Sequence, residues 1–138
     1  MIEETSSRAA DALMDNRGVS VSVELETGDP VGAFTIAVDG GPPVGRAEFV
    51  DPSGAEGERI FFHTEVDPAF GGRGLANLLL AEALAESISH GRTVVPLCPL
   101  FARHLERNGA EFVAAGGVFR VSTRADITLI SRLTKPRT

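Results

Sequence analysis

The sequence predicts a single mixed α/β domain, and three observations lead to this prediction. The length of 138 residues suits one domain, and the 43% hydrophobic content is typical of a globular chain. Four segments with strand character come first, separated by short turns rich in Gly, Pro and Asp. A helical pattern, a short apolar strand and a second helical pattern follow. This order indicates an antiparallel meander that leads into a strand–helix–strand–helix core.

The N-terminal strands are predicted from alternating apolar and polar residues. From Val19 to Glu26, valine and leucine alternate with serine and glutamate, which is the period of a half-buried strand. Three more strands are expected over 33–38, 44–50 and 59–66, each bounded by a turn. Residues 1–18 are polar and acidic, and they suit a tail or a short helix ending near Gly18 equally well.

The second half of the chain changes to helical spacing. Leucine and alanine residues recur at helical intervals from Gly74 to Ser89, and His90-Gly91 is a typical C-terminal cap. A strand is expected over 93–97, followed by a helix that begins at Pro99 and ends at Asn108-Gly109. The remaining segments are predicted as strands at 112–113 and 118–121, and as either a strand or a helix over 125–133.

Composition excludes several classes of function. The formal net charge of −6 argues against a nucleic-acid binder, which usually carries a basic patch. A single cysteine excludes a disulfide within the chain and a multi-cysteine metal site, and no metal site is predicted. The sequence shows no signal-peptide pattern and no membrane-spanning stretch, so a cytoplasmic protein is expected.

A glycine-rich loop joins the fourth strand to the long helix. Gly71, Gly72 and Gly74 surround Arg73, directly before the helix begins. Glycine lets the main chain approach a ligand closely, and amide groups at a helix N-terminus suit an anion such as a pyrophosphate. Arg73 adds a positive charge. The spacing is neither that of a P-loop nor that of a dinucleotide fold, and a flexible turn without a ligand is the alternative.

Three strings in this order resemble one known family. Gly71–Ala76 is similar to the Gln/Arg-x-x-Gly-x-Gly/Ala loop of the GNAT superfamily of acetyl-CoA-dependent N-acyltransferases. Gly74 and Ala76 match that pattern, whereas Gly71 stands where the pattern has Gln or Arg. His-Thr-Glu-Val at 63–66 and Val-Pro-Leu-Cys-Pro at 95–99 resemble segments of a short, single-domain GNAT-like subgroup. The resemblance covers residues 33–108 within a domain expected over 19–138.

The resemblance implies a cofactor, acetyl-CoA, and a place for it. The fourth and fifth strands of the sheet should splay apart, with pantetheine in the gap beside the main chain of Glu65 and Val66. The loop from Gly71 should hold the pyrophosphate on its amide groups, with a side-chain contact from Asn77. On the next helix, His104 and Asn108 should flank coenzyme A, unless that face is merely solvated. The residues assigned to the loop are Gly71, Gly72, Arg73, Gly74, Leu75 and Ala76.

Transfer to an amine requires a base for the ammonium and an acid for the departing thiolate. Strand alternation places His63 and Glu65 on one face, and Thr64 and Val66 on the other. Glu65, directly or through water, is one candidate base and His63 is the other; both also suit structural roles. Many superfamily members use a tyrosine as the acid, and this chain has none. Cys98 is therefore the candidate acid or acyl carrier, the alternative being a small buried side chain.

The function expected from these residues is transfer of an acetyl group from acetyl-CoA to a primary amine. The amine belongs to a small molecule or to a protein, and the sequence does not decide between them. A non-catalytic acyl-CoA-binding or partner-binding module on the same fold is the alternative. No nucleic acid or membrane is expected as a partner, and edge strands near the C-terminus allow a homodimer.

Overall fold

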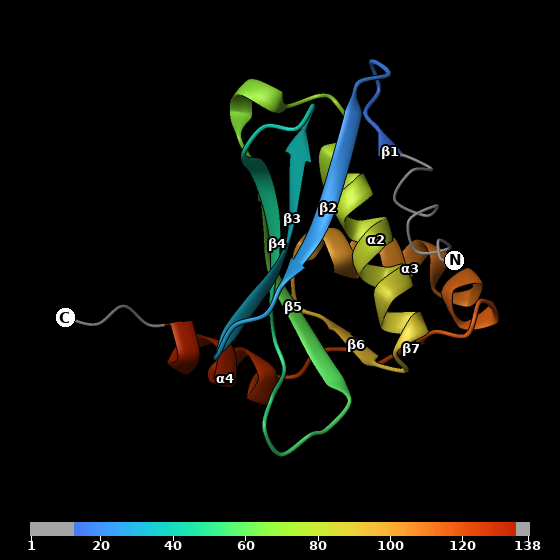
Figure 1. Ribbon diagram of the computed structural model, residues 1–138. Coiled ribbons are helices and arrows are strands. Elements are labelled where there is room, and N and C mark those ends of the chain that lie inside the picture. The colour runs from blue at the N-terminus through green and yellow to red at the C-terminus, as the bar shows by residue number, and fades with distance from the viewer. Residues whose placement is uncertain (1–12, 135–138) are drawn as a thin grey trace, which may run out of the picture.

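The computed structural model describes residues 13–134 as one curved, seven-stranded sheet with helices on both faces (Figure 1). The strands lie in the order of the sequence, from β1 to β7. They are β1 (Leu13–Met14), β2 (Ser20–Glu26), β3 (Val31–Val38), β4 (Pro43–Val50), β5 (Glu58–Val66), β6 (Thr93–Pro96) and β7 (Val118–Phe119). The helices are the 3-10 turn η1 (Pro68–Phe70), α2 (Leu75–Ser89), α3 (Pro99–Ala114) and α4 (Arg124–Thr134).

The predicted meander of four antiparallel strands, β2 to β5, is confirmed. One irregularity lies near its end: Phe49 pairs with Phe61 while Glu48 pairs with His63, so Phe62 is an extra residue in β5. Such a bulge resets the alternation of side chains along the strand. Phe61 packs under α2 and α3, and Phe62 packs on the other face of the sheet.

The predicted splay lies between β5 and β6, the fourth and fifth strands of the sequence prediction. The two strands run parallel only from Glu58–Thr93 to Phe61–Pro96. At that point the N–H groups of Leu97 and Cys98 both donate to the carbonyl of Phe61, at 3.0 and 2.8 Å, and the chain turns into α3. The second half of β5 is therefore paired with β4 alone.

Helices α2 and α3 cover one face of the sheet, and phenylalanine rings fill the space between the layers. The rings of Phe61 and Phe101 stack with centroids 4.5 Å apart, and Phe34 and Phe49 extend the cluster along the sheet. On the opposite face, α4 packs Ile130 against a second apolar cluster that contains Val50, Ile60 and Val95. Helix α4 covers only the end of that face near the β5–β6 pairing.

Segment 125–133, predicted as either strand or helix, is helical, and an ionic cluster attaches it to the sheet. Arg120 donates to both oxygens of Glu58 and both oxygens of Asp126, at 2.8 and 2.9 Å. Asp126 also accepts from the main chain and hydroxyl of Thr123. The Arg120 guanidinium, with help from Thr123, outweighs burial and lowers the pKa of the Asp126 carboxyl to about 2.

The helix predicted to end at Asn108-Gly109 continues to Ala114, so the strand predicted at 112–113 was wrong. Asn108 has a non-helical backbone (φ −123°, ψ 20°), but the chain returns to helical geometry after this kink. The cause is packing: Gly109 and Phe112 continue the buried side of the helix from Leu105. Phe119 lies so close to Gly109 that a β-carbon there would be 2.8 Å from its ring. The strand predicted over 118–121 is shorter, ending at Phe119.

At the N-terminal end, residues 13–18 form a strand and a turn and not the end of a helix. Leu13 pairs with Val21 and Met14 with Ser20, which makes β1 a short edge strand on β2. The part of the tail-or-helix prediction that covers residues 1–12 lies outside the described residues.

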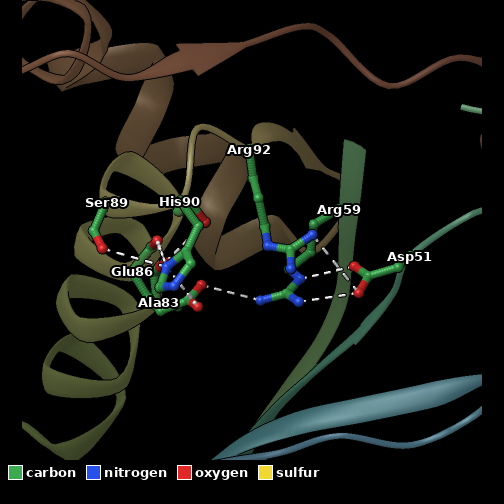
Figure 2. A network of polar contacts seen from close by, with 8 residues as sticks. Asp51, Arg59, Ala83, Glu86, Ser89, His90 and Arg92 are labelled. Atoms are coloured by element: carbon green, nitrogen blue, oxygen red, sulfur yellow. Dashed lines mark hydrogen bonds and ion pairs between the residues drawn. The ribbon is translucent and has the colours of Figure 1, made fainter. Parts of the chain in front are cut away.

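A buried arginine joins the sheet to α2 (Figure 2). The Arg59 side chain is only 2% exposed, and its guanidinium bonds both oxygens of Asp51, at 2.8 and 3.0 Å, and Glu86 at 3.2 Å. It also lies 3.8 Å from the centroid of the Phe49 ring. Buried charges require such partners, because an unpaired charge in the interior is strongly destabilising.

Candidate functional site

The glycine loop leaves a row of main-chain donors in front of α2. Gly72 and Gly74 have φ angles of +76° and +80°, a left-handed conformation that favours glycine, and Gly74 is the N-cap of α2. The N–H of Gly71 donates to Pro68 and that of Leu78 donates to Gly74. Between them, within the described residues, the amides of 72–77 donate to no protein acceptor. They are thus available to an anion at the positive end of the helix.

Arg73, predicted to add charge to this loop, is paired within the protein. Its guanidinium lies 2.8 Å from the Asp15 carboxylate, which is fully buried. Burial alone would raise the pKa of Asp15, but the N–H groups of Val19 and Arg17 and the Arg73 guanidinium outweigh it and lower that pKa. The Arg73 side chain therefore fixes the loop to the β1–β2 turn. The main-chain N–H of Arg73 donates to no acceptor among the described residues and is available to a ligand.

Asn16 makes a second connection between the same turn and the loop. Its N–H donates to the carbonyl of Arg73 at 3.0 Å, and its side-chain amide donates to that of Gly72 at 3.4 Å. A β-carbon on Gly74 would lie 2.8 Å from the Asn16 amide oxygen. Neither Asp15 nor Asn16 was predicted as a site residue, because both lie more than 50 residues from the loop in sequence.

A groove of about 550 Å³ runs between α2 and α3 and starts near this loop. It brings together three predicted residues, Asn77 from α2 and His104 and Asn108 from α3. The Asn108 amide lies 3.4 Å from the His104 ring nitrogen. The remainder of the lining is mostly apolar, with Leu80, Leu84, Ile88 and Phe112 among its residues. Its apolar walls with a few polar groups are typical of a ligand site.

Cys98 lies at the end of the opening between β5 and β6, immediately before α3. Its thiol is buried, with 4% of the residue exposed. The hydroxyl of Thr64 lies 3.4 Å from the sulfur, so the two groups share a hydrogen bond. Thr64 was predicted on the face opposite Glu65, without a role in the site. Strand alternation was the signal that could have located it.

His63 and Glu65 lie on the other face of β5, as predicted. The His63 ring nitrogen is 3.0 Å from the Glu65 carboxylate, and both side chains are at least half exposed. Glu65 also lines a pocket of about 570 Å³ with Arg46 and Asp67, where β4 begins and β5 ends. The structure thus joins His63 to Glu65 and Thr64 to Cys98, on opposite faces of β5. Among the described residues, no group of three or more His, Cys, Asp or Glu is suited to hold a metal ion.

A mixed sheet that opens between two parallel strands, with a glycine loop and a helix N-terminus beside the opening, defines the N-acetyltransferase fold class. Residues 33–114 match the model of the family described as GCN5-related N-acetyl-transferase. This chain belongs to that family. Across residues 13–134, no helix is long and apolar enough to cross a membrane.

Two solved structures resemble the chain at low identity. One is a ribosomal-protein-alanine N-acetyltransferase from Brucella melitensis biovar Abortus 2308, with 16% identity and a TM-score of 0.42. The other is an aminoglycoside acetyltransferase from an uncultured soil metagenomic sample, with 12% identity and a TM-score of 0.41. Each alignment covers 80% of this chain but only 65% and 60% of the other chains, less than two thirds of their length. No curated protein matches the sequence.

Proposed function

We propose that this protein transfers the acetyl group of acetyl-CoA to a primary amine. One observation carries the proposal. Strands β5 and β6 separate after Phe61, and β5, which forms one side of this opening, continues into the loop with the free amides of 72–77. A ligand with an anionic group and a long, narrow chain fits both features, the anion at the amides and the chain in the opening. The amides would hold the diphosphate, and the unpaired edge of β5, at Glu65 and Val66, would bond the pantetheine amides.

The groove between α2 and α3 is where the adenosine part of coenzyme A would bind. Asn77 at its edge and the pair His104–Asn108 on the facing helix offer hydrogen-bonding groups. Apolar side chains of α2 and α3 supply most of the other contact surface. Affinity for the coenzyme would thus come from main-chain groups and apolar contact more than from ionic side chains.

The chemistry requires groups on both sides of the opening. The amine nitrogen must first lose a proton, and the exposed pair of His63 and Glu65 is placed to accept it, directly or through water. The nitrogen lone pair then forms a bond to the acetyl carbon and the carbon–sulfur bond breaks. The nitrogen gives up its second proton to leave a neutral amide, and the departing thiolate takes up one proton. Cys98, on the other face of β5, either donates that proton or accepts the acetyl group before the amine does.

The base and Cys98 can act from opposite faces of the sheet, because a thioester lying in the opening is accessible from both faces. The acceptor would approach from the face that carries Glu65 and His63, where α4 leaves this end of the sheet uncovered (Figure 1). The exposed Glu65 carboxylate on that face suits an approaching ammonium group. The acceptor is either a small-molecule or a protein amine.

Two measurements on the full chain test the proposal. Calorimetric titration with coenzyme A and acetyl-CoA should show binding, and release of free thiol from acetyl-CoA should accelerate when amines are added. Binding without thiol release across a broad panel of amines would indicate a non-catalytic acyl-CoA-binding module. Intact-mass analysis after acetyl-CoA alone separates the two routes: a stable acetyl adduct that disappears in Cys98→Ala indicates an acyl carrier.

A further inference from the structure

The coenzyme site proposed above, on which this inference depends, has little positive charge of its own. Gly71 has no side chain, although the family pattern has Gln or Arg at that position. The Arg73 guanidinium is already neutralised by the Asp15 carboxylate at 2.8 Å. Asp67 adds a further carboxylate where the loop begins, and this carboxylate accepts from the N–H of Ala69. A diphosphate bound at the amides of 72–77 would therefore need a cation from outside the loop.

The β1–β2 turn, residues 15–18, lies beside these amides and is firmly attached to the loop (Figure 1). Asn16 donates to the carbonyls of both Gly72 and Arg73, and Asp15 binds the Arg73 side chain. These contacts occupy carbonyl oxygens of the loop and leave its N–H groups free. The turn is thus held in a fixed position against the loop that carries these donors.

Arg17 is the next residue of this turn, and its charge is not paired within residues 13–134. Its main-chain N–H donates to the Asp15 carboxylate at 2.8 Å, which holds the backbone at this position in place. Its side chain is exposed and forms no ion pair with any residue between 13 and 134. A guanidinium is well suited to phosphate because it donates two parallel hydrogen bonds in addition to its charge.

We propose that Arg17 binds the diphosphate of the coenzyme and supplies, from the β1–β2 turn, the positive charge that the glycine loop lacks. The coenzyme site then has two parts that are distant in sequence, the amides of 72–77 and the turn at 15–18. Residues 15–18 lie outside the segment that matches the family, 33–114. This ligand contact would therefore be a feature of the chain's own N-terminal region.

The test compares Arg17→Gln with Arg132→Gln, which removes the same charge from the exposed surface of α4 on the other face of the sheet. Each full-length protein is titrated with coenzyme A and with pantetheine, which lacks the diphosphate. The expected result for Arg17→Gln is about tenfold weaker binding of coenzyme A, with less sensitivity of the affinity to added salt. Pantetheine binding should stay within twofold of wild type, and Arg132→Gln should resemble wild type with both ligands.

Each other outcome is informative. Equal coenzyme A affinity in wild type and Arg17→Gln would overturn the assignment of Arg17 while leaving the proposed function intact. Equal weakening of coenzyme A and pantetheine would also overturn it, since it would indicate an altered fold and not a lost phosphate contact. No binding of coenzyme A by the wild-type chain would overturn the proposed function, and this inference with it. Arg17→Lys should recover part of the lost affinity.

Discussion

The hydroxyl of Thr64 and the thiol of Cys98 lie 3.4 Å apart, across the point where β5 and β6 separate. Thr64 comes from the strand that retains its partner on one side only, and Cys98 from the residue just before α3. Each therefore lies at a position fixed by the backbone. Their contact is a side-chain link between β5 and the start of α3, beyond the end of the β5–β6 ladder.

If Cys98 takes part in transfer, the first prediction is that Thr64→Val slows turnover by about three- to tenfold, the value of one ordinary hydrogen bond. The substitution keeps the shape of the side chain and removes only the hydroxyl. The measurements are kcat for thiol release and the rate of alkylation of Cys98, which should change because the thiol loses its hydrogen-bond partner. Thr128→Val, on the exposed side of α4, is the matched control. A slower reaction with an unchanged alkylation rate would contradict a role exerted through the thiol.

A second prediction concerns Gly74, whose left-handed backbone and close contact with Asn16 both exclude a side chain. Gly74→Ala should cost about 1 kcal/mol or more in folding free energy from its φ angle of +80°. It should also displace Asn16 and weaken coenzyme A binding, because the new β-carbon would lie 2.8 Å from the Asn16 amide oxygen.

The control for Gly74 is Gly40→Ala. Gly40 has a similar φ of +74°, but a β-carbon there would meet no atom within 4 Å. Urea unfolding should show comparable backbone cost in both variants, whereas calorimetry should show weaker coenzyme binding in Gly74→Ala alone. Weaker binding in both would mean that general destabilisation, and not the Asn16 contact, is responsible.

Sequence periodicity located the elements whose apolar residues recur at regular intervals within a single segment. Strands β2 to β5 and helix α2 are of this kind, and their bounds agree with the structure to within one or two residues. Helix α3 was cut short because an Asn-Gly pair is typical of a helix end. Its continuation depends on Phe119 packing against Gly109, a contact between segments that local patterns do not show.

The candidate site divides in the same way. Alternation along β5 was sufficient to place His63 and Glu65 on one face and Thr64 on the other, because all three residues belong to the same strand. The partner of Arg73 was not predictable from the loop, since Asp15 approaches from a turn 58 residues earlier. Arg73 was predicted to add a positive charge to the loop, and in the structure it forms an ion pair with Asp15. Local sequence gives the donors of this site, and only the tertiary fold gives its charge balance.

A third prediction follows from Asp126, whose pKa is lowered from 3.8 to about 2. A carboxyl whose pKa is lower in the folded state stabilises the protein at pH values above its unfolded pKa, and this contribution is lost as pH falls toward the folded value. Asp126→Asn should therefore reduce the free energy of unfolding by about 2 kcal/mol at pH 7. Near pH 2 the difference from wild type should largely disappear. Urea unfolding at several pH values measures both, with Glu106→Gln on the exposed side of α3 as control; a difference that is independent of pH would contradict the ionic origin.

The last prediction concerns Arg59, the buried guanidinium that joins β5, Asp51 and helix α2 (Figure 2). Arg59→Met keeps much of the apolar stem but leaves the Asp51 and Glu86 carboxylates without their shared partner. Removing one member of a buried ionic group typically costs about 3 kcal/mol or more, and we expect a loss of about 3 kcal/mol in urea unfolding. The triple variant Asp51→Asn, Arg59→Met, Glu86→Gln should recover part of that loss, because it also removes the two carboxylates that the single variant leaves without Arg59. If Arg59→Met were as stable as wild type, packing and not ionic contact would hold α2 on the sheet. The coenzyme affinity of the same variant would then show whether the position of α2 had changed.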